Sequence, residues 1–201
     1  KRTKRKPSTG VQKKLNQRHR KEKLRRLLHN NFTPEDLEIH LTYGGEQPGS
    51  DGEATRNLRN YIRRIKRLRK KMGLPPLKYM LVTAYTTKKG SEKPVRIHHH
   101  IIMNGGLDRD AVEELWRKRR RKGQKKGDRI GYCNADRLQA DENGIGALCN
   151  YLVKQAGGKK RWSTSQNLDR PVSQATDGKF TRRQIEKWAK ERPGREFWER
   201  K

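Results

Sequence analysis

Residues 95–104 (VRIHHHIIMN) form a β-branched, apolar run with three consecutive histidines at its centre, and two glycines follow it. Such a run predicts a β-strand, in which successive side chains point to opposite faces. His98 and His100 therefore share one face and His99 takes the other. Two imidazoles two residues apart on one face of a strand can converge on a single divalent ion. The run alone leaves open a metal site or a partly solvated histidine cluster at a strand end.

The charge of the chain indicates its partner. Lys and Arg number 52 against 22 Asp and Glu, which gives a formal net charge of +30 over 201 residues. A charge this one-sided repels itself unless a polyanion neutralises it, so nucleic acid is the expected partner and a membrane surface the weaker alternative. No apolar run approaches the roughly 18 residues of a membrane span, and no signal-peptide core is present. The two cysteines, Cys133 and Cys149, are too few for a disulfide framework or a zinc site, which predicts reduced core residues in a cytoplasmic protein.

Periodicity predicts alternating strands and helices. Alternating or continuous apolar stretches predict strands over 37–43, 77–86, 95–104 and 129–134. Apolar residues spaced by three or four predict helices over 12–28, 54–72, from Asp108 or Asp110 onward, 144–155 and 181–191. This order fits an α+β fold with a central antiparallel sheet and helices packed on one face, of ferredoxin-like or RRM-like type.

The predicted organisation is a basic tail and helix at 1–31, a domain at 32–165 and a basic extension at 166–201. Only 29% of residues are hydrophobic, so the core must be small. The chain starts at Lys1 rather than Met, which indicates a fragment.

A second pattern lies in the predicted helix 144–155. Its apolar residues form a stripe, and Tyr151, Lys154 and Gln155 project together from one flank of that stripe. Taken alone, such a tyrosine is typical of a border residue with an apolar ring and a solvated hydroxyl.

The histidine strand and the tyrosine helix together give the chain a recognisable pattern. It resembles the HUH endonucleases, most closely the rolling-circle replication initiator (Rep) proteins of bacterial phages, plasmids and integrative elements. The resemblance covers about residues 32–165 and rests on Leu41-Thr42-Tyr43, on His98–His100 and on Tyr151-x-x-Lys154-Gln155. The middle histidine, His99, departs from the family pattern, and by parity we assign it to packing on the helix side.

This resemblance implies a metal-dependent single-strand nickase and strand transferase in the bacterial cytoplasm. His98 and His100 would hold Mg²⁺ or Mn²⁺ at the scissile phosphate, and Tyr151 would attack phosphorus and become joined to the 5′ end of the DNA. A phenol with a pKa of about 10 needs help at neutral pH, and Lys154 is the expected source. The implied partners are single-stranded DNA with an origin hairpin and a host helicase. Neither Ala147 nor Gln155 offers a second tyrosine, so the pattern is that of a one-tyrosine enzyme.

The third metal ligand departs from the family pattern. Relatives often carry an acid in a Val-Thr-acid-Tyr sequence on the preceding strand, whereas residues 82–85 read Val-Thr-Ala-Tyr here. Ala84 cannot bind metal. Gln155 is the first choice as substitute, Glu38 and His40 are second choices, and weak metal binding is the remaining alternative.

Clusters of basic residues predict the nucleic-acid contacts. The expected contacts are Arg63, Arg64, Arg67, Arg119, Arg120, Lys159, Lys160, Arg161 and Trp162. The same clusters also suit a different class of protein, a non-catalytic binder of single-stranded DNA or RNA that uses Trp162 for stacking. Only the histidine pair and the tyrosine helix favour the enzyme over this alternative.

Overall fold

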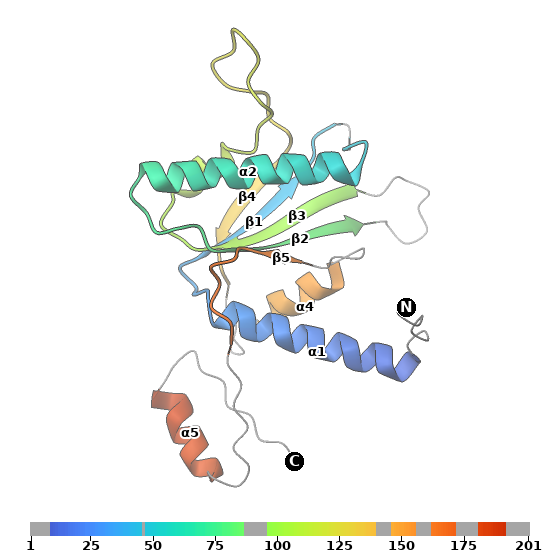
Figure 1. Cartoon of the computed structure of the whole chain (residues 1–201), viewed down its shortest axis with the longest axis vertical. Coiled ribbons are helices and arrows are strands. Elements are labelled where there is room, and N and C mark those ends of the chain that lie inside the picture. The colour runs from blue at the N-terminus through green and yellow to red at the C-terminus, as the bar shows by residue number, and fades with distance from the viewer. Residues whose placement is uncertain are drawn as a thin grey trace, which may run out of the picture.

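The computed structural model describes residues 9–45, 47–86, 96–139, 146–155, 162–171 and 181–191. Its elements are α1 (Gly10–His29), β1 (Leu37–Thr42), α2 (Asp51–Lys71), β2 (Tyr79–Thr86), β3 (Arg96–Met103), α3 (Arg109–Glu113), β4 (Cys133–Arg137), α4 (Gly146–Gln155), β5 (Ser163–Thr164) and α5 (Arg182–Glu191). The strands form one antiparallel sheet in the order β4-β1-β3-β2-β5 (Figure 1). The predicted α+β class with a central antiparallel sheet is confirmed.

One face of the sheet is covered by α2. This helix begins after Ser50, whose hydroxyl accepts a hydrogen bond from the Glu53 amide, and it buries an apolar stripe. Within that stripe Tyr61 and Ile65 are fully buried and pack against β1 and β3. The exposed face of α2 carries cations and turns away from the sheet.

The opposite face of the sheet is covered by α4 and α1, so the expectation that helices pack on one face only is wrong in that detail (Figure 1). Leu28 of α1 and Leu152 of α4 share a second apolar cluster with Val82 and Ile102 of the sheet. The physical reason is visible in β3, where Ile101 and Ile102 are consecutive and both fully buried. A strand that is apolar on both faces needs a helical layer on each side.

Three elements differ from the sequence-based expectation. The helix after Asp108 ends at Glu113, because the fully buried Trp116 turns inward and its indole N–H donates to the Thr42 carbonyl at 2.8 Å. The strand expected at 129–134 lies at 133–137 instead, since residues 117–130 form a separate arm. The short strand β5, two residues long, shows no apolar periodicity in the sequence.

Both cysteines are free, with Cys149 buried and Cys133 half-buried.

His99 lies on the α2 face, as strand parity predicts. Its side chain is fully buried, with the Tyr43 hydroxyl 2.9 Å from Nε2 and the Thr83 hydroxyl 3.0 Å from Nδ1. A neutral imidazole has one donor and one acceptor nitrogen, so these two hydroxyls satisfy it completely. Burial first, and the neighbouring imidazoles second, lower the pKa of His99 to about 3.

We therefore expect His99→Ala to destabilise the fold by about 2–4 kcal/mol, since it leaves a cavity and two buried hydroxyls without a partner. Urea denaturation measures the loss, and His98→Ala is the matched control on the same strand with an expected cost well below it. Equal losses in the two variants would contradict the assignment of His99 to packing.

Candidate metal centre

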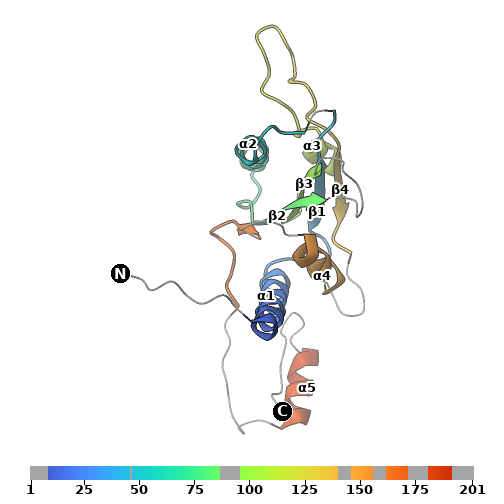
Figure 2. The same cartoon turned by 90° about the vertical axis from the view of Figure 1, so that its right-hand side faces the viewer.

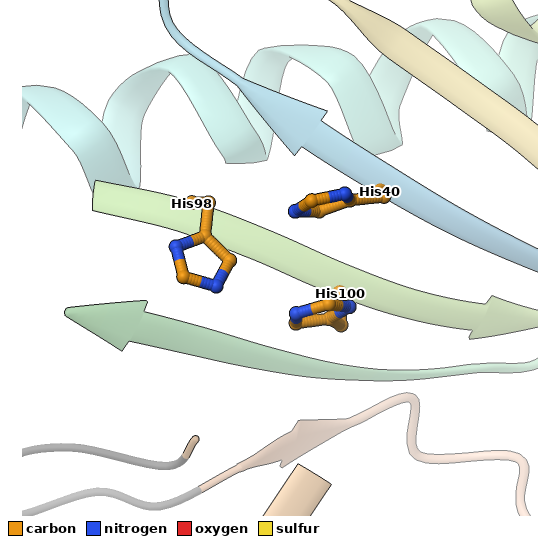
Figure 3. Close-up of side chains that lie close together, drawn as sticks. All are labelled: His40, His98 and His100. Carbon is orange, nitrogen blue, oxygen red and sulfur yellow. The ribbon is translucent and has the colours of Figure 1, made fainter. Parts of the chain in front are cut away.

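The register of the central strands gathers three histidines on the face opposite α2. His40 of β1 lies directly across from His100 of β3, and His98 occupies the next row of the same face, across from Thr42. Residues paired directly across antiparallel strands point to the same side of the sheet. A ligand atom from each of His40, His98 and His100 lies within 4.8 Å of the others, and the three rings converge in Figure 3.

The rings are held in a fixed arrangement. The imidazoles of His40 and His100 are stacked, with centroids 4.6 Å apart and planes 3° from parallel, and His98 stands edge-on to both at 5.3 and 5.2 Å. His98 is 8% exposed and His100 is 3% exposed. Burial, followed by the charges of His100 and His98, lowers the pKa of His40 to about 4, and burial followed by His100 also lowers the pKa of His98. His40 and His98 are therefore neutral at pH 7, which is the form that binds a metal ion.

The buried nitrogens of this cluster fit a divalent metal ion. Nε2 of His40 and both ring nitrogens of His100 are buried and have no hydrogen-bond partner within the described part of the chain. A buried polar atom without a partner is unfavourable and uncommon. A divalent cation between these rings would give the buried nitrogens a partner and so remove the cost of burying them unpaired.

The predicted ligands are thus only partly brought together. His98 and His100 lie in the cluster, and its third member is His40, a second choice on sequence grounds. Glu38 lies at the border, with Oε1 3.8 Å from Nδ1 of His100, which is too long for a hydrogen bond but places a carboxylate beside the cluster. Ala84 is paired with His98 and supplies no ligand. The side chain of Gln155, the first choice, lies outside the described residues.

Tyr151 of α4 lies beside the cluster. Its ring centroid is 5.1 Å from that of His100, and the two rings are perpendicular. Cys149 and Leu152 anchor α4 in the second apolar cluster, so Tyr151 projects from the flank of the helix and remains 42% exposed. Lys154 belongs to the same helix, but its side chain is not among those described.

A basic arm extends from the end of the sheet at which β1 ends with Thr42. Residues 117–130 extend away from the sheet in Figures 1 and 2, and Arg119 and Arg120 lie on the exposed part of this arm. Residues 119–125 line an open hollow of ≈ 660 Å³. The base of the arm lies near the β1 end that carries Thr42, since the Trp116 indole donates to the Thr42 carbonyl.

A single carboxylate holds the base of this arm together. Glu114 forms ion pairs with Arg117 at 2.7 Å, Arg129 at 2.8 Å and Lys126 at 3.3 Å. Hydrogen bonds from these three cations, that of Arg117 first, lower the pKa of Glu114 to about 2. The cations of the base are thereby partly neutralised, whereas Arg119, Arg120 and Arg121 at the tip have no ion pair with any acid in the described part of the chain.

The other predicted nucleic-acid contacts lie in different places. Arg63 and Arg67 are exposed on α2, on the far side of the sheet from the histidines. Arg64 is committed to the fold, because its guanidinium donates to the Leu115 and Arg117 carbonyls at the arm base. Trp162 is half-buried against the second apolar cluster, which leaves less of its ring available for stacking. Lys159, Lys160 and Arg161 fall outside the described residues.

If the arm contacts phosphates, as its charge predicts, neutralising it should reduce the salt dependence of binding to single-stranded DNA. A triple variant, Arg119→Gln, Arg120→Gln and Arg121→Gln, should lower the slope of log K against log[salt] by up to about 2, equally for all sequences, because each phosphate contact in single strands contributes about 0.7. The matched control removes three exposed cations from α2, with Arg63→Gln, Arg67→Gln and Lys70→Gln, and should change the slope much less. A changed sequence preference with an unchanged slope would show that the arm reads bases instead.

No family model, curated protein or solved structure matches this chain. Among the described helices, none combines the length and the apolar character that crossing a bilayer requires.

Proposed function

We propose that this chain is a metal-dependent endonuclease that nicks and rejoins single-stranded DNA through Tyr151. The observation that carries the proposal is the placement of an accessible tyrosine ring 5.1 Å from a buried histidine of a three-histidine cluster. A metal-binding cluster alone, or an exposed tyrosine alone, is common. Their juxtaposition on a strongly basic protein supports phosphoryl transfer on a nucleic acid.

The proposed reaction is a transesterification. A divalent ion held by His40, His98 and His100 would polarise the scissile phosphate and offset its charge. The Tyr151 hydroxyl oxygen bonds to phosphorus, the bond from phosphorus to the 3′ oxygen breaks, and the phenolic proton is balanced by the proton gained at that 3′ oxygen. One phosphoester replaces another, so the 5′-phosphotyrosine link can be reversed by the free 3′ hydroxyl. Lys154, one turn further along α4, is the proposed aid to ionisation of the phenol.

The chemical nature of the ligand atoms favours one divalent ion over another. Mg²⁺ prefers oxygen ligands, whereas imidazole suits transition metals. Three imidazoles with Glu38 at their border therefore favour Mn²⁺ over Mg²⁺. We infer Mn²⁺ as the better activator of the two.

The biological setting follows from the resemblance to Rep proteins alone. It comprises initiation of rolling-circle replication in a bacterial cytoplasm, recognition of an origin hairpin and cooperation with a host helicase. A non-catalytic binder of single-stranded DNA or RNA is the second candidate, and the net charge of +30 with the exposed basic arm favours it equally. The histidine cluster beside Tyr151 is what separates the two candidates.

Incubation with a hairpin-bearing oligonucleotide and Mn²⁺, followed by a denaturing gel, tests the proposal. The expected products are a protein joined to the downstream part of the oligonucleotide and a released upstream fragment that ends in a 3′ hydroxyl. Chelation of the metal should abolish both. A protein that binds Mn²⁺ and DNA but yields neither product would be the non-catalytic binder.

A further inference from the structure

Tyr132 is an aromatic residue on the histidine face of the sheet that the proposed reaction does not use. The Thr42 amide donates to the Tyr132 carbonyl at 2.9 Å, which continues the β1–β4 ladder by one residue beyond the Leu41–Cys133 pair. Tyr132 is thus directly across from Thr42, and Thr42 is directly across from His98. The three residues form one row across the sheet, and their side chains share one face.

The ring of Tyr132 is 78% exposed. Three other tyrosines of the central fold have hydrogen-bond partners: the hydroxyl of the buried Tyr61 donates to the Val112 carbonyl, the Tyr43 hydroxyl meets His99, and the Tyr85 hydroxyl donates to Asp51. Within the described part of the chain, the side chain of Tyr132 makes no hydrogen bond and no ring contact. In a protein so poor in apolar residues, such a ring is a prominent feature of the surface.

The backbone holds Tyr132 firmly even though its side chain is exposed. A Cβ on the preceding Gly131 would lie 2.2 Å from the Thr42 carbonyl oxygen and 2.5 Å from the Gly44 nitrogen, so only glycine permits this close approach of the chain to the end of β1. On the other side, β4 pairs with β1. A ring on a fixed backbone loses little entropy when a ligand stacks on it.

The surface between Tyr132 and the histidines is polar and accessible. Asn134, next on this face of β4, is exposed and lies directly across from His40. The main packing contacts of the described part of α4 are with β2 and α1, and its Tyr151 reaches His100 of β3, whereas β4 is not among its main contacts. Two strand spacings of about 4.8 Å separate β4 from β3, so Tyr132 lies about 10 Å from His98 across the sheet. That distance suits a nucleotide flanking the one bound at the histidines.

We propose that Tyr132 is a stacking platform for an unpaired base of the strand whose scissile phosphate lies at the histidine cluster. This inference rests on the proposed single-stranded substrate. The basic arm next to Tyr132 has no aromatic or aliphatic residue from Arg117 to Arg129, so it offers cations for phosphates but no aromatic ring on which a base can stack. Tyr132 would add base stacking to the phosphate contacts of the arm, because every base has a face on which an aromatic ring can stack.

Binding of fluorescent oligonucleotides tests this inference. The background is Tyr151→Phe with chelator present, so that no cleavage intervenes. Tyr132→Ala is expected to weaken binding about tenfold, within the range of one stacked base, and Tyr132→Phe to leave it within about twofold. Tyr132→Leu, which retains bulk without an aromatic face, should behave like Tyr132→Ala. The matched control is Tyr85→Ala, a partly exposed tyrosine on the α2 face, which should bind normally.

An abasic scan of the oligonucleotide shows whether the lost contact is a base. With Tyr132 present, removal of one base near the nick site should weaken binding about tenfold, and with Tyr132→Ala the same removal should have no further effect. Undiminished sensitivity to every abasic position in Tyr132→Ala would overturn the inference. If this coupling appears in a protein that forms no adduct, the stacking site stands and the endonuclease proposal fails. If an adduct forms without this coupling, the endonuclease proposal stands and the stacking site fails.

Discussion

Tyr151→Phe is expected to abolish the covalent protein–DNA adduct, with a loss of strand cleavage on the order of 10³-fold or more. Phenylalanine keeps the ring that stands perpendicular to His100 and removes only the hydroxyl that would attack phosphorus. Folding, Mn²⁺ binding and DNA binding should therefore stay as in the wild type. The measurement is a denaturing gel of the reaction, with mass spectrometry of the adduct to locate the modified residue.

Tyr79→Phe is a suitable control for this experiment, because Tyr79 is paired with Met103 and lies on the α2 face, away from the histidines. It should form the adduct at the wild-type rate. A phosphotyrosine mapped to any residue other than Tyr151 would refute the assignment of the nucleophile. So would full adduct formation by the Tyr151→Phe variant.

The second large effect concerns the metal. His40→Ala, His98→Ala and His100→Ala should each weaken Mn²⁺ binding by about 100-fold or more, since each removes one of three donor atoms that lie within 4.8 Å of one another. Titration calorimetry measures the affinity, and cleavage should fall in parallel. DNA binding without metal should remain mostly intact, because the basic surface supplies it.

Two further variants sharpen this result. Glu38→Gln keeps the size of the side chain but removes its charge, and should weaken Mn²⁺ binding about tenfold if Glu38 acts through its charge beside the cluster rather than binding the ion itself. Gln155→Ala separates the two candidates for the third ligand. Intact Mn²⁺ binding in Gln155→Ala with its loss in His40→Ala is the expected pattern, and the opposite pattern would make Gln155 the ligand.

The parts of this site that could be predicted from sequence are those set by local geometry. Alternation along one strand suffices to place His98 and His100 on one face and His99 on the other, and helical spacing places Tyr151 beside an apolar stripe. His40 could not be assigned in this way. Its membership depends on the β1–β3 register, which pairs residues 60 apart in the chain and is fixed by the packing of both strands on α2.

Two other features had weaker signals. The consecutive Ile101, Ile102 and Met103 of β3 are typical of a strand buried on both faces, and this pattern could have indicated the second helical layer. The alternation of Ile130 and Tyr132 predicts a strand over 129–134, but the strand begins only at Cys133, and in the segment before it Ile130 enters the core while Tyr132 faces solvent. Periodicity alone does not distinguish an inward residue from one that is exposed for binding.

The metal ligands and the proposed nucleophile lie on elements that differ in how they are held in the fold, because β3 is at the centre of the sheet and α4 is not part of it. Two of the three histidines lie on this strand, hydrogen-bonded on both edges, and the third lies on β1, which is also paired on both edges. Such strands belong to the last cooperative unit to unfold. Tyr151 lies on α4, a ten-residue helix whose described side chains pack against α1, β2 and β3 and which has no place in the strand ladder. The proposed nucleophile therefore resides on an element that can separate by local unfolding, while the metal ligands stay in register through the same event.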